Sequence, residues 1–235
     1  MGPVRLVVSD RLGGVSRMEY QSLNLADHVG DDPADVAENR DLLARRLGIR
    51  PMAIVHAEHG ARVRIVDVPG TAGPGDVLVT TTRGLGLLAL SADCVAGAIA
   101  APDVPALAVF HSGWRGVVAD TAGAAVAALV DLGAKPETMS FRLGPSICGL
   151  CYEVSDEVAD QVARAAPPAR SRTRAGTPAA DIGAGVRWQL QRAGVPPDRG
   201  GERRCTLEDP NLFSHRRDGV TGRQGVLAAM EEWSA

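Results

Sequence analysis

Residues 91–116 read SADCVAGAIAAPDVPALAVFHSGWRG, and this stretch organises the rest of the chain. Two apolar runs, residues 95–101 and 106–110, flank a short segment with a proline at each end, which predicts two strands joined by a turn. Cys94 comes directly before the first run, and His111 comes directly after the second. We therefore expect the fold to deliver a thiol and an imidazole to one rim, where they share a site.

Hydrophobic patterning outside this stretch predicts both strands and helices. Short β-branched, alternating or apolar runs predict strands at residues 4–8, 53–55, 62–66, 77–80, 85–90 and 140–143, and a last apolar run lies at residues 224–230. Helical spacing predicts helices at residues 33–47, 117–132, 155–165 and 181–193. The loops are expected at residues 71–76, which are rich in glycine, and at residues 166–178, which should form a mobile surface loop.

The first of these helices should end at Gly48 and expose Arg40, Arg45 and Arg46. A turn at residues 83–84 should join two neighbouring strands. The strands come in groups rather than in strict alternation with helices, which favours a layered α+β fold over a doubly wound sheet. Because no linker is long enough to separate two domains, residues 1–235 are expected to form a single domain.

Composition argues against several classes of partner. The 235 residues are 45% hydrophobic, which is ample for a packed core, and the net charge of −3 gives no support for binding to nucleic acid or to a membrane surface. No apolar run approaches the roughly 20 residues of a membrane-spanning helix. The residues before the first strand show no signal-peptide core, so we expect a cytoplasmic protein whose four cysteines are thiols or ligands rather than disulfides.

The first group of candidate chemical residues consists of His59, Cys94 and His111. Two imidazoles and a thiolate form a plausible three-ligand zinc set, which leaves a fourth position for water. The three residues are too far apart in sequence to form a local metal motif, and spacing alone favours a buried cysteine with two isolated histidines. Their position at the ends of apolar runs, beside glycine or aspartate, favours a shared site.

A second group imitates the zinc deaminase signature. His56 and Glu58 fit its H-x-E element, and Cys148 and Cys151 fit its C-x-x-C element. The proline lies three residues before Cys148 instead of directly before it, and the two elements are far apart. We therefore rank this group below the first one. A redox function for the C-x-x-C pair is weaker still, because no helix clearly begins at the first thiol.

Arg115 is the strongest candidate for holding an anion. It lies between Gly113 and Gly116, which permit a close approach of the backbone, and it precedes a predicted helix. Arg216 and Arg223 are further candidates, as is Arg40, although a single arginine is more often a solvated surface charge.

Motifs along nearly the whole chain resemble one known family. They are Gly13-Gly14-Val15-Ser16, Leu23-Asn24-Leu25, Gly30-Asp31-Asp32, Glu38-Asn39-Arg40, His59-Gly60, Leu78-Val79-Thr80, Ala92-Asp93-Cys94, His111-Ser112-Gly113-Trp114-Arg115-Gly116, Gly144-Pro145-Ser146-Ile147, Cys151-Tyr152-Glu153-Val154, Cys205-Thr206, Phe213-Ser214-His215-Arg216-Arg217 and Gly222-Arg223. The A-D-C and H-(A/S)-G-W-R-G pair in this order is specific. The chain resembles the YfiH-type family, also called the laccase-domain or multicopper polyphenol oxidoreductase family.

This resemblance implies a fold and an activity. The fold would be an α/β/β/α sandwich of mixed sheets, with zinc bound by His59, Cys94 and His111. Similar proteins phosphorolyse adenosine, inosine and methylthioadenosine and deaminate adenosine, so the expected ligands are a purine nucleoside and phosphate. Older naming implies a copper-dependent polyphenol oxidase, and some members are linked to peptidoglycan editing. We expect a monomer or a weak homo-oligomer.

The resemblance also assigns roles. Cys94, His111 and Arg115 are the expected catalytic residues, with zinc activating water for attack at C6 of adenine and Arg115 holding phosphate. Asn24, Arg40 and Arg216 lie in matched motifs and are candidates for binding substrate or phosphate. Asp93 either orients an imidazole or is a turn residue. No residue is assigned as the proton donor to the leaving purine.

Three positions depart from the family pattern, and three other functions stay open. Ala57 replaces the family glutamine, Ala96 a proline and Ser112 the commoner alanine. A copper oxidase is disfavoured because none of the five methionines falls in the motifs that would supply an axial ligand. A cysteine hydrolase with Cys94 as nucleophile and His111 as base would be metal-free. A non-catalytic binding protein is supported only by Ala57.

Overall fold

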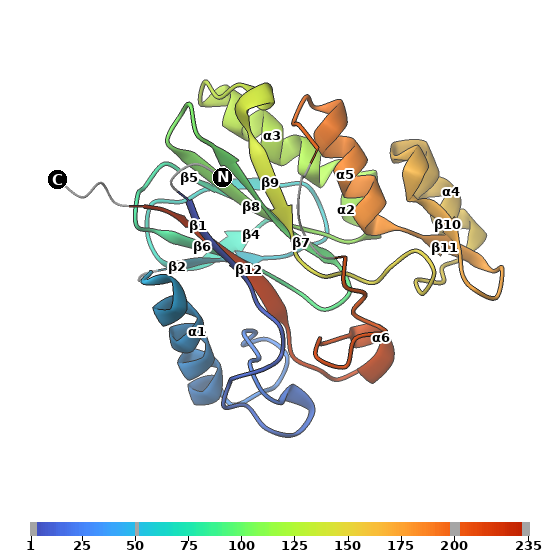
Figure 1. The fold of residues 1–235 in the computed structure, drawn as a ribbon, viewed down its shortest axis with the longest axis horizontal. Coiled ribbons are helices and arrows are strands. Elements are labelled where there is room, and N and C mark those ends of the chain that lie inside the picture. Colours follow the sequence, from blue (N-terminus) through green and yellow to red (C-terminus); the bar gives the residue numbers. More distant parts are fainter. Residues whose placement is uncertain (1–3, 50–51, 198–202, 232–235) are drawn as a thin grey trace.

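A computed structural model describes residues 4–49, 52–197 and 203–231. Residues 1–3, which entered the prediction that the chain has no signal-peptide core, lie outside the described residues. Two five-stranded sheets form the centre of the fold (Figure 1). The first sheet has the order β1 (Val4–Val8), β12 (Gln224–Met230), β6 (Gly86–Ser91), β2 (Met52–His56) and β4 (Gly70–Pro74). The second has the order β3 (Val63–Ile65), β5 (Val77–Thr80), β8 (Ala106–Ser112), β7 (Val95–Ala101) and β9 (Ser140–Leu143). Both sheets contain parallel and antiparallel pairs.

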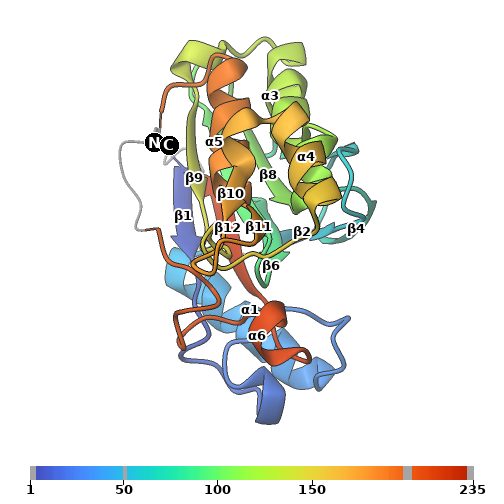
Figure 2. The same ribbon diagram turned by 90° about the vertical axis from the view of Figure 1, so that its right-hand side faces the viewer.

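Helices cover the outer face of each sheet (Figure 2). α1 (Pro33–Leu47) covers the first sheet, and α2 (Trp114–Val118), α3 (Thr121–Asp131), α4 (Asp156–Ala165) and α5 (Ile182–Arg192) lie on the side of the second. The short helix α6 (His215–Asp218) lies below the sheets, and 3-10 turns occur at Met18–Tyr20, Pro136–Thr138 and Pro167–Ala169. One apolar core lies between the two sheets, a second between the second sheet and α2 to α5, and a third between the first sheet and α1. The predicted α/β/β/α sandwich is confirmed.

The β7–β8 hairpin confirms the two strands predicted from residues 91–116. Its register pairs Val95 with Ser112 and Ala96 with His111. Cys94 and His111 therefore lie at the same end of the hairpin, because antiparallel pairing returns the chain to the edge from which it started. Both strands are buried along their whole length and lie inside the second sheet, which fixes this end of the hairpin firmly.

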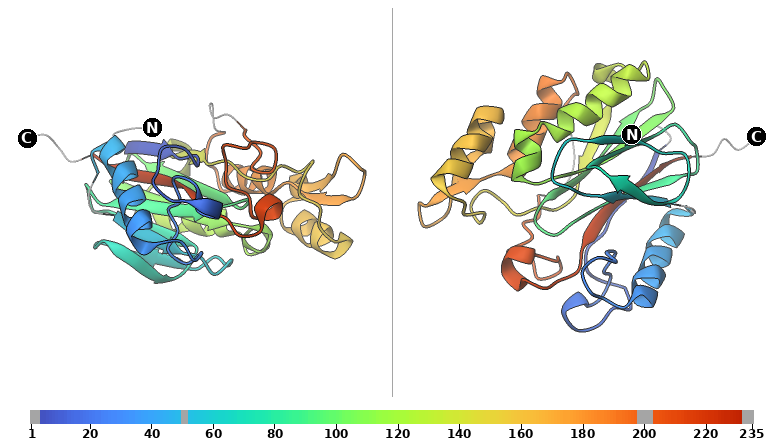
Figure 3. Two further views of the ribbon diagram at one scale, coloured as in Figure 1. Left: turned by 90° about the horizontal axis from the view of Figure 1, so that it is seen from below. Right: turned by 180° about the vertical axis from the view of Figure 1, so that it is seen from behind.

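The first helix begins and ends as predicted. The side chain of Asp32 accepts a hydrogen bond from the backbone N–H of Ala34, and Gly48 ends the helix with a φ of 65°. The expected exposure of Arg40 was wrong, because its side chain is only 17% exposed and pairs with Asp27. Viewed from below, α1 and α6 lie on the near side of the molecule (Figure 3).

Two predicted loops contain regular structure. Residues 70–74 form β4, which pairs in parallel with β2 at the edge of the first sheet. Residues 170–172 and 178–180 form the hairpin β10 (Arg170–Arg172) and β11 (Pro178–Ala180) instead of a mobile loop. Both predictions were wrong because glycine- and proline-rich sequences have low strand propensity, and it is the pairing with a partner strand that makes these segments extended.

The helix predicted at residues 117–132 is two helices. Asp120 adopts a left-handed conformation with a φ of 59°, and its side chain accepts a hydrogen bond from the backbone N–H of Gly123 at the start of α3. An aspartate at this position ends one helix and caps the next, which an alanine-rich pattern conceals. The two strands on either side of the 83–84 turn also belong to different sheets. In the described ranges, no helix is both long and apolar enough to span a membrane.

Candidate metal centre and active-site cavity

Three predicted ligands from separate elements lie together. His59 comes from the loop between β2 and β3, Cys94 directly precedes β7, and His111 lies near the end of β8. Their ligand atoms all lie within 4.8 Å of one another. The two imidazole rings are edge to face, with centroids 4.9 Å apart and an interplanar angle of 86°. The structure therefore brings together the set that local spacing did not favour.

Gly113 makes this close approach possible. A Cβ atom at this position would lie 2.8 Å from the Cys94 Sγ and 3.4 Å from the His59 Cδ2. The first distance is shorter than non-bonded atoms tolerate, so any side chain here would displace the thiol. The glycine of the H-(A/S)-G-W-R-G motif thus has a steric function at the cluster.

Asp76 supports the cluster and was not predicted. Its Oδ1 lies 2.9 Å from the Nδ1 of His111, and its carboxylate accepts hydrogen bonds from the backbone N–H groups of Glu58, His59 and Gly60. Asp76 is fully buried, so these groups replace water around the charge. The carboxylate therefore orients His111 and shapes the loop that carries His59. An aspartate at the border of a glycine-rich loop and a strand was the only signal in the sequence.

Electrostatics favour a thiolate beside an imidazolium when no metal is bound. Burial opposes ionisation of the Cys94 thiol, but hydrogen bonds and charge from His111 and His59 lower its pKa to about 6. Burial opposes protonation of His111, but Asp76 and Cys94 raise its pKa to about 9. Burial alone would raise the pKa of Asp76, yet its hydrogen bond with His111 lowers it. Asp76 is therefore a carboxylate, and the Nδ1 of His111 carries the proton that it donates.

A cavity of about 640 Å³ opens beside the cluster, within the range of roughly 300–1,000 Å³ that is usual for small-molecule sites. All five histidines of the chain line it, at positions 28, 56, 59, 111 and 215. Arg223 lines it as well, and burial lowers the pKa of its guanidinium. Histidines spread over the whole sequence gave no local signal that they share one cavity. Ala57 also lies on this wall.

Arg115 is not among the residues that line this cavity. It is exposed, and its guanidinium stacks on the ring of Trp114, with the Cζ 4.4 Å from the ring centroid. The cation that faces the cavity is Arg223, whose Nη1 donates to the backbone oxygens of Thr221 and Gly222. Among the candidate arginines, Arg223 is therefore the one that lines this cavity.

Asn24 and Arg40 lie behind the cavity wall. Asn24 is fully buried, and its side chain bonds Ala26 and Asp31 and accepts from the backbone N–H of Arg223. Arg40 pairs with Asp27, which lines the cavity, at 3.2 Å. Neither Asn24 nor Arg40 lines the cavity. Both residues hold others that reach the cavity.

Asp93 holds three segments together and contacts no imidazole in the hydrogen bonds of the described residues. Its carboxylate accepts from the Thr206 hydroxyl at 2.6 Å, the Ser214 hydroxyl at 2.7 Å and the backbone N–H of Arg216 at 2.6 Å. Asp93 is therefore neither a simple turn residue nor the partner of an imidazole, because its carboxylate anchors Thr206, Ser214 and Arg216. The Arg216 guanidinium stacks on Tyr152, 5.0 Å from the ring centroid, and donates to the backbone oxygen of Glu153, outside the cavity lining.

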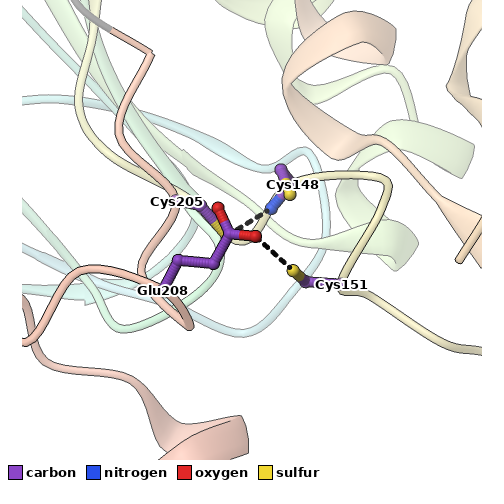
Figure 4. Close-up of side chains that lie close together, drawn as sticks. All are labelled: Cys148, Cys151, Cys205 and Glu208. Atoms are coloured by element: carbon purple, nitrogen blue, oxygen red, sulfur yellow. Dashed lines mark hydrogen bonds between the residues drawn. The ribbon is translucent and has the colours of Figure 1, made fainter. Parts of the chain in front are cut away.

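The deaminase-like group does not assemble. Cys148 and Cys151 lie with Cys205 and Glu208 (Figure 4). Glu58 instead forms an ion pair with Arg62 at 3.1 Å. This arrangement agrees with the prediction that the deaminase-like group is a weaker candidate than His59, Cys94 and His111.

The His59, Cys94 and His111 donor set fits zinc. Two imidazoles and a thiolate are common zinc ligands, and the Asp76 carboxylate on the distal nitrogen of His111 is the partner that zinc-binding histidines usually have. A blue-copper site would also need a weak axial ligand, commonly methionine, and no methionine is among the cavity residues that the structure describes.

The chain belongs to the YfiH-type family, because residues 5–231 match the family described as multi-copper polyphenol oxidoreductase laccase. It is 46% identical over 220 residues to a purine nucleoside phosphorylase of Streptomyces coelicolor, covering 92% of this chain and 90% of the relative. The crystal structure of YlmD from Geobacillus stearothermophilus is similar with a TM-score of 0.90 and 34% identity, covering 98% of this chain and 93% of that one. YfiH from Bacillus licheniformis gives a TM-score of 0.87 and 25% identity, with coverages of 97% and 93%.

Proposed function

We propose that this protein is a zinc-dependent purine nucleoside phosphorylase that cleaves adenosine, inosine and methylthioadenosine and also deaminates adenosine. The observation that carries the proposal is the cavity of about 640 Å³, which joins the His59–Cys94–His111 cluster to the cation of Arg223. A nucleoside and a phosphate together need one such space with an anion site. The relative from Streptomyces coelicolor, which bears the name purine nucleoside phosphorylase, supports the same activity.

In phosphorolysis the bond between C1′ of the ribose and N9 of the purine breaks, and a bond from C1′ to a phosphate oxygen forms. The purine leaves with the electron pair of the broken bond and takes up a proton from the phosphate or from solvent. Arg223 is the residue proposed to hold phosphate, because a guanidinium binds phosphate oxygens through two parallel N–H groups. His215 lines the same cavity. Its Nδ1 donates to the backbone oxygen of Gly219 at 2.6 Å, which leaves its Nε2 free for a ligand.

Deamination would use the His59–Cys94–His111 cluster. Zinc bound there supplies Lewis acidity toward an oxygen ligand, which attack on C6 of adenine requires. The chain's own part is to hold the imidazole of His111 through Asp76 and to keep the thiol of Cys94 ionised through two neighbouring imidazoles. Burial of His111 and Asp76 keeps water from competing for these contacts.

Incubation with inosine and phosphate should yield hypoxanthine and ribose 1-phosphate, measured by chromatography of the bases and a coupled assay for the sugar phosphate. With adenosine, both adenine and hypoxanthine should appear, because deamination competes with cleavage. Omitting phosphate should stop base release and leave deamination of adenosine to inosine. Base release at the same rate without phosphate would mean hydrolysis and would reject phosphorolysis.

Arg223→Gln should raise the KM for phosphate by about tenfold or more, because a charge-assisted hydrogen bond contributes roughly 1.5–3 kcal/mol. Arg115→Gln is the matched comparison, since it removes the same charge from a side chain that stacks on Trp114 outside the cavity lining. Its effect on the phosphate KM should be smaller. The opposite ranking of the two variants would return the phosphate site to Arg115. Phosphate titrations at saturating inosine measure both.

A further inference from the structure

Three of the four cysteines form a second cluster, away from Cys94. Cys148, Cys151 and Cys205 lie with Glu208 so that their three Sγ atoms and a carboxylate oxygen are all within 4.8 Å of one another (Figure 4). Cys205 is buried, the other two cysteines are half-buried and Glu208 is exposed. None of the three cysteines forms a disulfide. The mechanism proposed above uses none of these residues.

Two short turns build this cluster. In the first, the backbone N–H groups of Cys151 and Tyr152 both donate to the backbone oxygen of Cys148, which brings the two thiols of the C-x-x-C sequence to one side. In the second, the N–H groups of Glu208 and Asp209 donate to the backbone oxygen of Cys205. The second sequence is therefore C-x-x-E with the same spacing. Paired turns with two residues between the ligands are a usual way in which a chain forms a tetrahedral zinc site.

The spacing of the ligand atoms fits a zinc ion. A tetrahedral site with Zn–S bonds of about 2.3 Å places its ligand atoms about 3.8 Å apart. Atoms that already lie within 4.8 Å of one another need shifts of about an ångström or less to reach this geometry. Thiolates are soft ligands that select zinc over calcium or magnesium. An iron–sulfur cluster normally needs four cysteines, and this cluster has three.

Outer contacts also fit a charged metal site. The backbone N–H of Cys148 donates to the Cys205 Sγ at 3.3 Å, and the Arg174 Nη1 donates to the Cys151 Sγ at 3.2 Å. Arg174 also forms an ion pair with Glu208. Such contacts offset the negative charge that three thiolates and a carboxylate leave around a divalent ion, and partners of this kind are regular features of metal sites.

We propose that Cys148, Cys151, Cys205 and Glu208 bind a structural zinc ion. Binding would release the thiol protons to solvent and fasten the segment after β9 to the segment before α6. Both segments reach Asp93, because Ile147 donates its N–H to the Asp93 backbone oxygen and Thr206 donates its hydroxyl to the Asp93 carboxylate. The zinc ion would therefore stabilise the support of the Cys94 loop without touching the cavity.

Zinc content of variants tests this site separately from the one at Cys94. Protein purified without added metal and measured by plasma mass spectrometry should hold about two zinc ions per chain. Cys94→Ala should remove one of them, and Cys151→Ser should remove the other. X-ray absorption of the Cys94→Ala protein should show about three sulfur ligands at roughly 2.3 Å. This test does not depend on the proposed nucleoside activity.

Three outcomes would overturn the proposal. They are a Cys94→Ala protein without zinc, a zinc environment without sulfur in that variant, and a disulfide between two of the three cysteines in the native protein, detected by mass spectrometry after alkylation.

Should Cys151→Ser fold poorly, Glu208→Gln at an exposed position is the second variant, with Glu157→Gln on α4 as its matched control. Glu208→Gln should weaken zinc retention against a chelator about tenfold and lower Tm, and equal retention in both variants would exclude Glu208 as a ligand.

Discussion

Protein with the Cys94→Ala substitution should lose one zinc ion per chain and the deamination of adenosine. Cys94 supplies the only thiolate of its cluster among the described residues, and its Sγ lies within 4.8 Å of the His59 and His111 ligand atoms. Two imidazoles without the thiolate hold zinc weakly, because three protein ligands are the usual minimum of a catalytic site. Since Lewis-acid catalysis is worth several kcal/mol, deamination should fall by roughly three orders of magnitude. Metal analysis and the adenosine assay measure these losses.

Ser112→Ala is the control for Cys94→Ala. It removes a buried hydroxyl beside His111, while all three ligands stay. Its metal content and activity should match the wild type. A Cys94→Ala protein that keeps full deaminase activity would place the chemistry elsewhere. A wild-type protein that holds no metal but loses activity when Cys94 is alkylated would favour a cysteine hydrolase, since the Cys94 pKa of about 6 suits a nucleophile.

The sequence predicted the hairpin and its two terminal groups because that information is local. Apolar runs at residues 95–101 and 106–110 determine two strands, and antiparallel pairing then puts Cys94 and His111 at one edge. β4 could not be predicted in the same way, because its glycines and proline have low strand propensity. Its pairing partner is β2, and 13 residues, 57–69, separate the two strands in the sequence.

Positions in the site that depend on tertiary contacts were also beyond local patterns. Asp76 directly precedes β5, and it approaches His111 because β5 pairs with β8. The backbone N–H of His111 donates to the backbone oxygen of Asp76. Arg223 directly precedes β12, which pairs with β6 in the first sheet. Because Gln224 at the start of β12 pairs with Ser91 at the end of β6, Arg223 lies close to the turn that carries Cys94 and reaches the cavity. The burial of Arg40 depends in the same way on its ion pair with Asp27 from a separate loop. A single sequence reveals the chemical groups, and strand pairing decides which of them meet.

Asp76→Asn should lower zinc affinity at the Cys94 cluster and the deamination of adenosine by about 100-fold, and it should destabilise the fold. An asparagine oxygen can still accept from His111 or from a backbone N–H, but its amide is a donor and faces other donors. The native carboxylate accepts from His111 and from three backbone N–H groups. Each buried donor left without an acceptor costs roughly 1–3 kcal/mol, so Tm should fall by roughly 5–10 °C. Zinc competition with a chelator and thermal unfolding measure the two effects.

Asp120→Asn is the matched control, because it makes the same chemical change away from the cavity. Asp120 caps α3 with a φ of 59°, a role and a conformation that asparagine fills equally well, and its ion pair with Arg192 is exposed. Zinc affinity, activity and Tm should change little. If Asp76→Asn lowers Tm as expected but leaves zinc affinity unchanged, Asp76 shapes the loop of His59 without orienting His111. Loss of zinc affinity with an unchanged Tm would mean that the backbone N–H groups find other acceptors, and the orientation of His111 would then be the main function of the carboxylate.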